Sequence, residues 1–250
     1  MAFNKSMVVA MTDIRNALEL RFVKWGVFGM GAMGPISTII MIPGILLLDP
    51  SAMDYIGILM PYSSTMLGMF SLIPAAMISA NAFVGEREQK TLEPLLATPL
   101  TDNEILLGKT LSAFIPSMAI LIFGTLATMI GSAVILLAAG LPFLLVPDIP
   151  GIILIAASTP ALVIAIVALM ILISSRVSRV YEAYQISAVA VLVYMFPMIV
   201  PTMFIEQSML IEDIIWITNI ITILVSVILM AVLSLVAFRQ FNRDRMVSLV

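Results

Sequence analysis

The stretch Ile149–Ser175, IPGIILIAASTPALVIAIVALMILISS, holds 27 residues without a charged side chain. A helix that crosses a bilayer needs about 20 mostly apolar residues, so this segment alone is long enough to span a membrane. Of the 250 residues in the chain, 62% are hydrophobic and only 11% are charged, and the mean hydropathy is +1.16. A soluble domain carries about 25% charged residues. The composition therefore excludes a soluble globular fold and predicts a membrane protein with several spans.

Six long runs without charge follow one another along the chain. They predict an all-α membrane protein with six transmembrane helices, at about residues 25–48, 58–84, 110–138, 152–175, 183–205 and 214–238. The run 55–85 is expected to form one tilted helix. The run 110–147 is expected to hold one span followed by an apolar loop, and two short spans are the alternative.

The positions of the charges decide between these alternatives, because Lys and Arg collect on the cytoplasmic side of short loops. With six spans, all 12 Lys and Arg residues lie on one side, in segments 1–24, 86–109, 176–182 and 239–250. The other side then carries six acidic residues and no basic one. A seventh span would destroy this separation. We therefore predict a multi-pass protein of the cell (cytoplasmic) membrane with both termini in the cytoplasm. The net charge of −3 gives no basic surface for nucleic acid.

Apolar residues recur at helical spacing in the N-terminal segment 1–24 and just beyond it. They are Met7, Met11, Ile14, Leu18, Phe22 and Trp25. The pattern predicts an amphipathic helix that lies in the inner membrane interface before the first span. A cytoplasmic extension of the first span is the alternative.

Residues 86–109 form the longest polar stretch, between the second and third spans. Thr91 is expected to cap a short helix, and Leu92, Leu95 and Leu96 give that helix an apolar stripe. A small helix with exposed Leu residues and a charged rim suits docking into a groove of a partner protein. The alternative is a helix that lies on the membrane or on neighbouring loops.

The next helix is expected to start at Thr101, because Thr101 and Glu104 have the spacing of a capping box. The loop as a whole carries a series of residues at fixed offsets: Glu86-Arg87-Glu88, Thr91-Leu92-Glu93, Leu95-Leu96, Thr98-Pro99, Glu104 and Gly108-Lys109. This series resembles the signature of type-2 ABC transporter permeases, and the six-helix layout extends the resemblance over the whole chain.

The resemblance implies a permease that forms a homodimer, or a heterodimer with a paralogous permease, and that binds cytoplasmic ABC ATPase subunits. The loop 86–109 would then be the coupling loop, and its short helix would dock into the ATPase. The residues implied in ATPase coupling are Glu86, Arg87, Glu88, Thr91, Leu92, Glu93, Leu95, Leu96, Thr98 and Pro99. The chain has no Gly-x-x-x-x-Gly-Lys-Ser/Thr phosphate loop. We therefore expect no cofactor on this chain, with ATP and Mg²⁺ bound by the partner ATPase.

The predicted spans contain few residues of the types that act in catalysis or proton transfer. The sequence has neither His nor Cys, and no ionisable residue lies near the middle of a span, which argues against an intramembrane enzyme or a carboxylate proton relay. Hydroxyl and amide side chains in lipid are mostly expected to bond to a neighbouring helix. A few of them are candidates for lining a translocation path in the second and fifth spans, which the resemblance places at the dimer interface: Ser64, Ser71, Asn81, Tyr184, Gln185 and Tyr194.

The sequence therefore predicts the permease subunit of an ABC exporter that is not itself an enzyme. A membrane scaffold or assembly subunit that uses an ABC ATPase without transporting is the first alternative, and a channel is the second.

The charge separation predicts the accessibility of two single cysteines in a chain that has none of its own. A membrane-impermeant maleimide added to intact cells should label Asp148→Cys and should not label Gln89→Cys. Both positions should react in opened membranes. The reverse pattern in intact cells would overturn the orientation.

Overall fold

The computed structural model describes residues 2–88, 101–174, 176–177, 179–203 and 211–240. These residues form helices joined by short connections, and no strand occurs among them. Six helical segments are long and apolar enough to cross a membrane: Arg21–Leu48, Ile56–Gly85, Asn103–Ala138, Ile149–Ile173, Val180–Thr202 and Ile211–Ala237. The predicted all-α fold with six transmembrane helices is confirmed.

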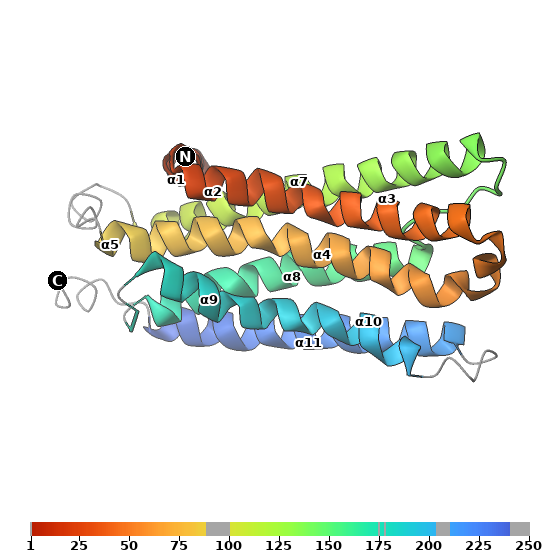
Figure 1. The fold of residues 1–250 in the computed structure, drawn as a ribbon. Coiled ribbons are helices and arrows are strands. Elements are labelled where there is room, and N and C mark those ends of the chain that lie inside the picture. The colour runs from red at the N-terminus through yellow and green to blue at the C-terminus, as the bar shows by residue number, and fades with distance from the viewer. Residues whose placement is uncertain (1, 89–100, 175, 178, 204–210, 241–250) are drawn as a thin grey trace.

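The elements up to residue 88 are α1 (Ala2–Glu19), α2 (Arg21–Trp25), π-helical η1 (Gly26–Met30), α3 (Gly31–Leu48), 3₁₀-helical η2 (Pro50–Tyr55), α4 (Ile56–Ala80), π-helical η3 (Asn81–Gly85) and α5 (Glu86–Glu88). The elements from residue 102 onward are α7 (Asp102–Ala138), α8 (Ile149–Ile173), α9 (Val180–Val191), 3₁₀-helical η4 (Leu192–Tyr194), α10 (Met195–Thr202) and α11 (Ile211–Gln240). The long helices run side by side, while α1 is seen nearly end-on and crosses their direction (Figure 1).

The two longest apolar runs each form a single span, as predicted. The second span continues without a break from α4 through η3 into α5, although Pro61 and Pro74 lie inside it. The third span ends at Ala138, and Gly140 follows it with a φ of +72°, a left-handed conformation that favours glycine at a helix end. The chain then crosses to α8 in a non-helical connection, so no further span is hidden there.

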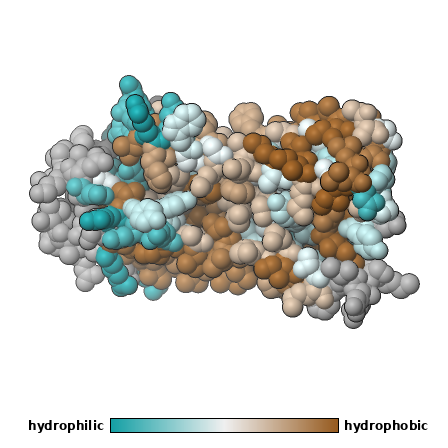
Figure 2. Space-filling view, viewed as in Figure 1, coloured by the Kyte–Doolittle hydropathy of each residue, from teal (hydrophilic) through white to brown (hydrophobic). Residues whose placement is uncertain are grey.

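Charge divides the bundle into two ends. The first is the basic end, where α1, α5, the start of α7 and the end of α11 lie together (Figure 1). The second is the acidic end, which carries Asp49, Asp148, Glu212 and Asp213 in the connections between spans. In the space-filling view, hydrophilic side chains gather at the basic end and hydrophobic ones cover the length of the helices (Figure 2). This distribution is the one that a bilayer around the middle of the bundle requires.

The spans α4 and α8 form the centre of the bundle. The most apolar window of the second span is 78% buried and that of the fourth span is 61% buried, against 17–33% for the other four. Small residues, including Ala75 and Ala76 on α4 and Ala161 and Ala165 on α8, are buried in these two helices. Small side chains let membrane helices approach closely, which supplies the packing that apolar burial does not supply in lipid.

Tyr194 joins the fifth span to this centre and is fully buried. Its ring packs so closely on Gly68 of α4 that a Cβ there would lie 2.5 Å from the ring atoms Cε1 and Cζ. Its hydroxyl lies 2.6 Å from Ser158 Oγ and 2.5 Å from Thr159 Oγ1, both on α8. One side chain therefore fixes three spans relative to one another.

Most other hydroxyls in the spans bond within their own helix, which differs from our expectation. Ser63 donates to the carbonyl of Met60 at 2.7 Å, and Thr222 donates to the carbonyl of Thr218 at 2.8 Å. The carbonyl three or four residues earlier is always within reach of a helical Ser or Thr, whereas a partner on another helix depends on packing. The amide of Asn219, in contrast, does bond to another helix, because its Nδ2 donates to the carbonyl of Pro150 on α8 at 3.2 Å.

The contact between Gly68 and Tyr194 predicts the effect of one added methyl group. We expect Gly68→Ala to lower the free energy of unfolding by about 1–3 kcal/mol, the usual cost of overpacking a tight core. Gly124→Ala in α7 is the matched control, because its nearest neighbour would lie at 3.6 Å, an ordinary van der Waals distance. Thermal unfolding in detergent measures both variants. Equal melting temperatures for the two would contradict the packing described.

Candidate functional site

The coupling loop begins at α5 and ends at α7, and Thr101 defines its second boundary. Thr101 Oγ1 accepts a hydrogen bond from the Glu104 backbone N–H at 3.3 Å, and Glu104 Oε2 accepts one from the Thr101 N–H at 2.9 Å. The capping box predicted from the sequence is thereby confirmed. It fixes the residue at which the polar loop ends and the third span begins.

Lys109 lies about two turns beyond this cap, and its side chain is only 4% exposed. Its Nζ lies 2.7 Å from Glu86 Oε1 and donates a hydrogen bond to the carbonyl of Ala82. The same ammonium lies 5.2 Å from the centre of the Phe83 ring. A buried charge is tolerated only when it is paired and hydrogen-bonded, so these contacts are a condition for burying Lys109. They hold the start of the third span against the end of the second.

Helix α1 adds a second carboxylate to this site. Asp13 Oδ2 lies 3.9 Å from Lys109 Nζ, and the Asp13 side chain is 11% exposed. Next to it α1 crosses α7 in close contact, since a Cβ at Gly108 would lie 2.7 Å from Val9 Cβ and 2.9 Å from the carbonyl oxygen of Ser6. The N-terminal helix and both sides of the coupling loop therefore meet at one ammonium group. We call Asp13, Glu86 and Lys109 the loop-base triad.

Burial changes the protonation of Asp13, which lies outside the spans. Desolvation raises the pKa of its carboxyl from 3.8 to about 6. The positive charge of Lys109 opposes this rise, and the negative charge of Glu86 adds to it. Desolvation outweighs the attraction of Lys109, so the pKa of Asp13 stays raised although an ammonium group is close.

Small residues line the face of α1 that packs most closely against the bundle, and part of the predicted apolar stripe is exposed. Val9, Ala10 and Ala17 are buried, whereas Met11 is 63% exposed and Trp25, beyond α1, is 73% exposed. The close crossing at Gly108 requires small side chains, so Met11 points away from the bundle, where lipid could cover it, whereas Leu18 of the same stripe packs partly buried against the core. That this helix lies in the membrane interface remains a prediction.

Glu88 makes a contact on the other side of the loop base. Its Oε2 accepts a hydrogen bond from the backbone N–H of Val180 at 3.3 Å. The N-cap of α9, Arg179, makes no side-chain capping bond, so a carboxylate from α5 satisfies this orphan donor at the start of the fifth span. The chain also continues as helix through Gly85, from the end of the second span into α5.

The other predicted coupling residues are placed as follows. The side chain of Arg87 and the residues Thr91, Leu92, Glu93, Leu95, Leu96, Thr98 and Pro99 lie outside the part of the chain that the structure describes. The short docking helix therefore remains a prediction. Glu86 and Glu88 make the contacts within the chain given above, and a role of either toward an ATPase also remains a prediction.

The residues predicted to line a path are not brought together in one place. Ser64, Ser71 and Tyr194 are fully buried inside the chain, and Ser64 and Ser71 donate to the carbonyls of Pro61 and Gly68. Asn81 and Tyr184 are half-buried, and Gln185 is exposed. Only the last three offer surface to a path outside the protomer.

Sequence reasoning missed Asp13, and it singled out Lys109 only as part of a motif. The signal for Lys109 was its place inside the third helix, beyond the capping box, where a charged residue needs a partner. The signal for Asp13 was weaker, since it interrupts a row of small residues, Ala10 and Ala17, at helical spacing.

The comparison with known protein families covers most of the chain. Residues 4–215 match a family described as ABC-2 family transporter protein. The match includes α1, five of the six spans and the start of the sixth, together with the whole loop-base triad. No curated protein gives a significant match.

The raised pKa of Asp13 predicts a pH-dependent stability. A carboxyl with a raised folded-state pKa stabilises the fold fully below its unfolded value, 3.8, and this contribution is lost as the pH rises through about 6. At pH 7.5, Asp13→Asn should therefore be more stable than the unmodified protein by about 2–3 kcal/mol. Below about pH 4 the difference should vanish.

Melting temperatures measured across this pH range, in detergent, test the prediction. Glu19→Gln removes an exposed carboxylate from the same helix, paired only with Arg15 at its surface, and serves as the control. A difference between Asp13→Asn and the unmodified protein that does not change with pH would show that folding leaves the pKa of Asp13 unchanged.

Proposed function

The chain belongs to the ABC-2 transporter family, and we propose that it is the permease subunit of an ABC exporter that works with a separate cytoplasmic ATPase. The family match over residues 4–215 carries this proposal. Six apolar helices supply the membrane domain that a permease needs. The chain has no phosphate-binding loop of its own, so ATP and Mg²⁺ would be bound by the partner.

In this proposal the basic end faces the cytoplasm of the cell membrane. Lys and Arg favour the cytoplasmic side of short loops, and the basic residues of this chain fall at the end that carries the coupling loop. The loop would then meet the ATPase, and both termini would lie on the same side. Two such permeases, identical or paralogous, would complete the transporter.

The loop-base triad explains how a force on the loop would reach the membrane. Glu86 follows directly on the second span and Lys109 belongs to the third, so their ion pair joins the two arms of the loop. Asp13 ties α1 to the same point. An ATPase that displaced the docking helix would therefore move the two spans and α1 as one unit rather than bending the loop alone.

The second span would pass this movement to the rest of the bundle. It packs against α3, α7, α8 and α9, and it is the most deeply buried of the six. Asn81, Tyr184 and Gln185 lie on the second and fifth spans near the basic end and keep some exposed surface. We assign these three to a path at a permease dimer interface, and Ser64, Ser71 and Tyr194 to bracing within the protomer.

Docking through the Leu stripe predicts the outcome of a double substitution. We expect Leu95→Asp with Leu96→Asp to release the ATPase, because two charges in an apolar groove lose the burial that binds it. A tagged chain purified from its native membrane in mild detergent should bring down a soluble protein with a phosphate-binding loop, identified by mass spectrometry. That protein should be absent from the double variant.

Leu95→Met with Leu96→Met is the matched control, since Met keeps the apolar surface at similar volume. Cysteine labelling confirms that each variant still inserts. Unchanged recovery of the ATPase with the Asp variant would refute docking through this stripe. A chain that purifies alone even after cross-linking would refute the permease proposal.

A further inference from the structure

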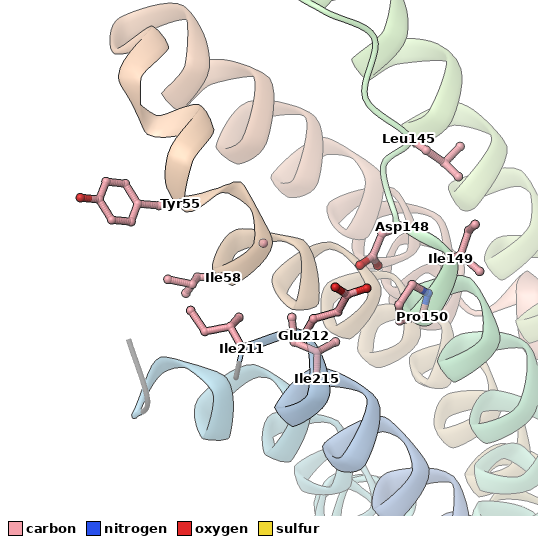
Figure 3. A pocket seen from close by; sticks show the side chains of 10 residues that line it. Tyr55, Ile58, Leu145, Asp148, Ile149, Pro150, Ile211, Glu212 and Ile215 are labelled. Atoms are coloured by element: carbon pink, nitrogen blue, oxygen red, sulfur yellow. The ribbon is translucent and has the colours of Figure 1, made fainter. Parts of the chain in front are cut away.

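A pocket of about 600 Å³ lies at the acidic end of the bundle, opposite the end that carries the coupling loop. Its walls come from the start of α4, the connection before α8 and the start of α11. Small-molecule sites in proteins usually have volumes of about 300–1,000 Å³ and mostly apolar walls. Aliphatic side chains, among them Ile58, Leu145 and Ile215, line most of this pocket (Figure 3).

Two carboxylates interrupt the apolar lining. Asp148 precedes α8, Glu212 lies in the first turn of α11, and the two side chains point toward one another across the pocket (Figure 3). No Lys or Arg is among the residues that line it. The neighbouring connections carry acids and no base, so nothing on this side of the chain supplies a counter-charge.

The position of Asp148 is fixed by the backbone. Its Oδ1 accepts a hydrogen bond from the Gly151 N–H at 3.0 Å, which caps α8. Burial raises the pKa of the Asp148 carboxyl, whereas the bond from Gly151 opposes the rise. A Cβ at residue 151 would lie 2.7 Å from Asp148 Oδ1 and 2.9 Å from Ser64 Cβ, so only glycine leaves room for this arrangement.

The wall next to Asp148 is held in the same way. Asn219 of α11 donates from its Nδ2 to the carbonyl of Pro150, a lining residue, and so ties α11 to α8 one turn below Ile215. Asn219 is 3% exposed, and its Oδ1 has no hydrogen-bond partner among the described residues. The contact of three spans therefore forms an apolar pocket with one fixed carboxylate, Asp148, a second and exposed carboxylate, Glu212, and a buried acceptor beside its wall.

We propose that this pocket binds an organic cation with an apolar body, whose charge is balanced by Asp148 and Glu212. The donor set favours this class over a divalent metal ion, because Ca²⁺ takes six to eight oxygen ligands and Mg²⁺ demands six. Here two carboxylates stand among aliphatic side chains, which suit a hydrocarbon body with one positive charge. The proposal concerns a different end of the molecule from the coupling loop and goes beyond the permease function.

Binding of a shape-matched ion pair tests the proposal without any ATPase. Tetraphenylphosphonium and tetraphenylborate have nearly the same shape and opposite charge. With the chain in dodecyl maltoside, which has no ammonium group, equilibrium dialysis against empty micelles should show saturable binding of the phosphonium ion. The borate ion should bind at least about tenfold more weakly, since the pocket repels an anion.

Substitutions assign the binding to the pocket. Asp148→Asn and Glu212→Gln should each raise the dissociation constant of tetraphenylphosphonium by about fivefold or more. Asp213→Asn removes a carboxylate one residue away that does not line the pocket, and it should change the constant by less than about twofold, because solvent separates this charge from a bound cation. Asn keeps the ability to cap α8 at position 148. If Asp148→Asn unfolds nevertheless, the binding measurement on Glu212→Gln tests the proposal by itself, because Glu212 is exposed.

Equal binding of the two ions by the unmodified chain, or equal effects of Glu212→Gln and Asp213→Asn, would overturn the proposal. The ammonium group could come from a lipid headgroup or from a free compound. Competition by a short-chain phosphatidylcholine identifies the headgroup as the source, and binding undisturbed by it identifies a free cation. Failure here leaves ATPase recovery unaffected, and loss of the ATPase leaves this binding unaffected.

Discussion

The burial of Lys109 is the constraint around which the basic end of the molecule is arranged. An ammonium group that is almost without solvent contact requires a carboxylate and hydrogen-bond acceptors, and the end of the second span supplies Glu86 and the carbonyl of Ala82. The helical continuation from α4 through η3 into α5 is what brings both groups to it. Asp13 completes the site from α1, at a crossing that only the missing side chain of Gly108 allows.

The same reasoning applies deeper in the membrane, where apolar burial alone does not select one arrangement of helices. Close approach and a few polar contacts do so instead. Tyr194 occupies the space left by Gly68 and bonds two hydroxyls of α8, and Asn219 bonds the first turn of that helix. Specific contacts thus fix both central spans along their length, and in addition fix the second span at its end and α8 at its start, while the outer spans keep broad apolar faces for lipid.

The features that could be predicted from the sequence are those that depend on interactions between residues close together in the chain. The number of spans, the single helix over residues 55–85 and the capping box of Thr101 depend on neighbouring residues, and all three appear in the structure. The loop-base triad joins residues from three separate segments, so no periodicity could identify it. The face of α1 that packs against α7 could not be identified from the sequence for a related reason, because the crossing selects small residues whereas the amphipathic pattern marks large ones.

One continuous helix connects the acidic-end pocket with the base of the loop. From Ile56 to Glu88 the chain stays helical over 33 residues, a length of about 50 Å. Its first turn adjoins the acidic-end pocket through Ile58, and its last turn belongs to the base of the coupling loop. Such a rod acts as a lever: a tilt of about 5° at the loop base would carry its far end by about 4 Å. If both proposals hold, the pocket and the coupling loop would be linked mechanically by this helix, and a cation bound at one end would change the work needed to move the other.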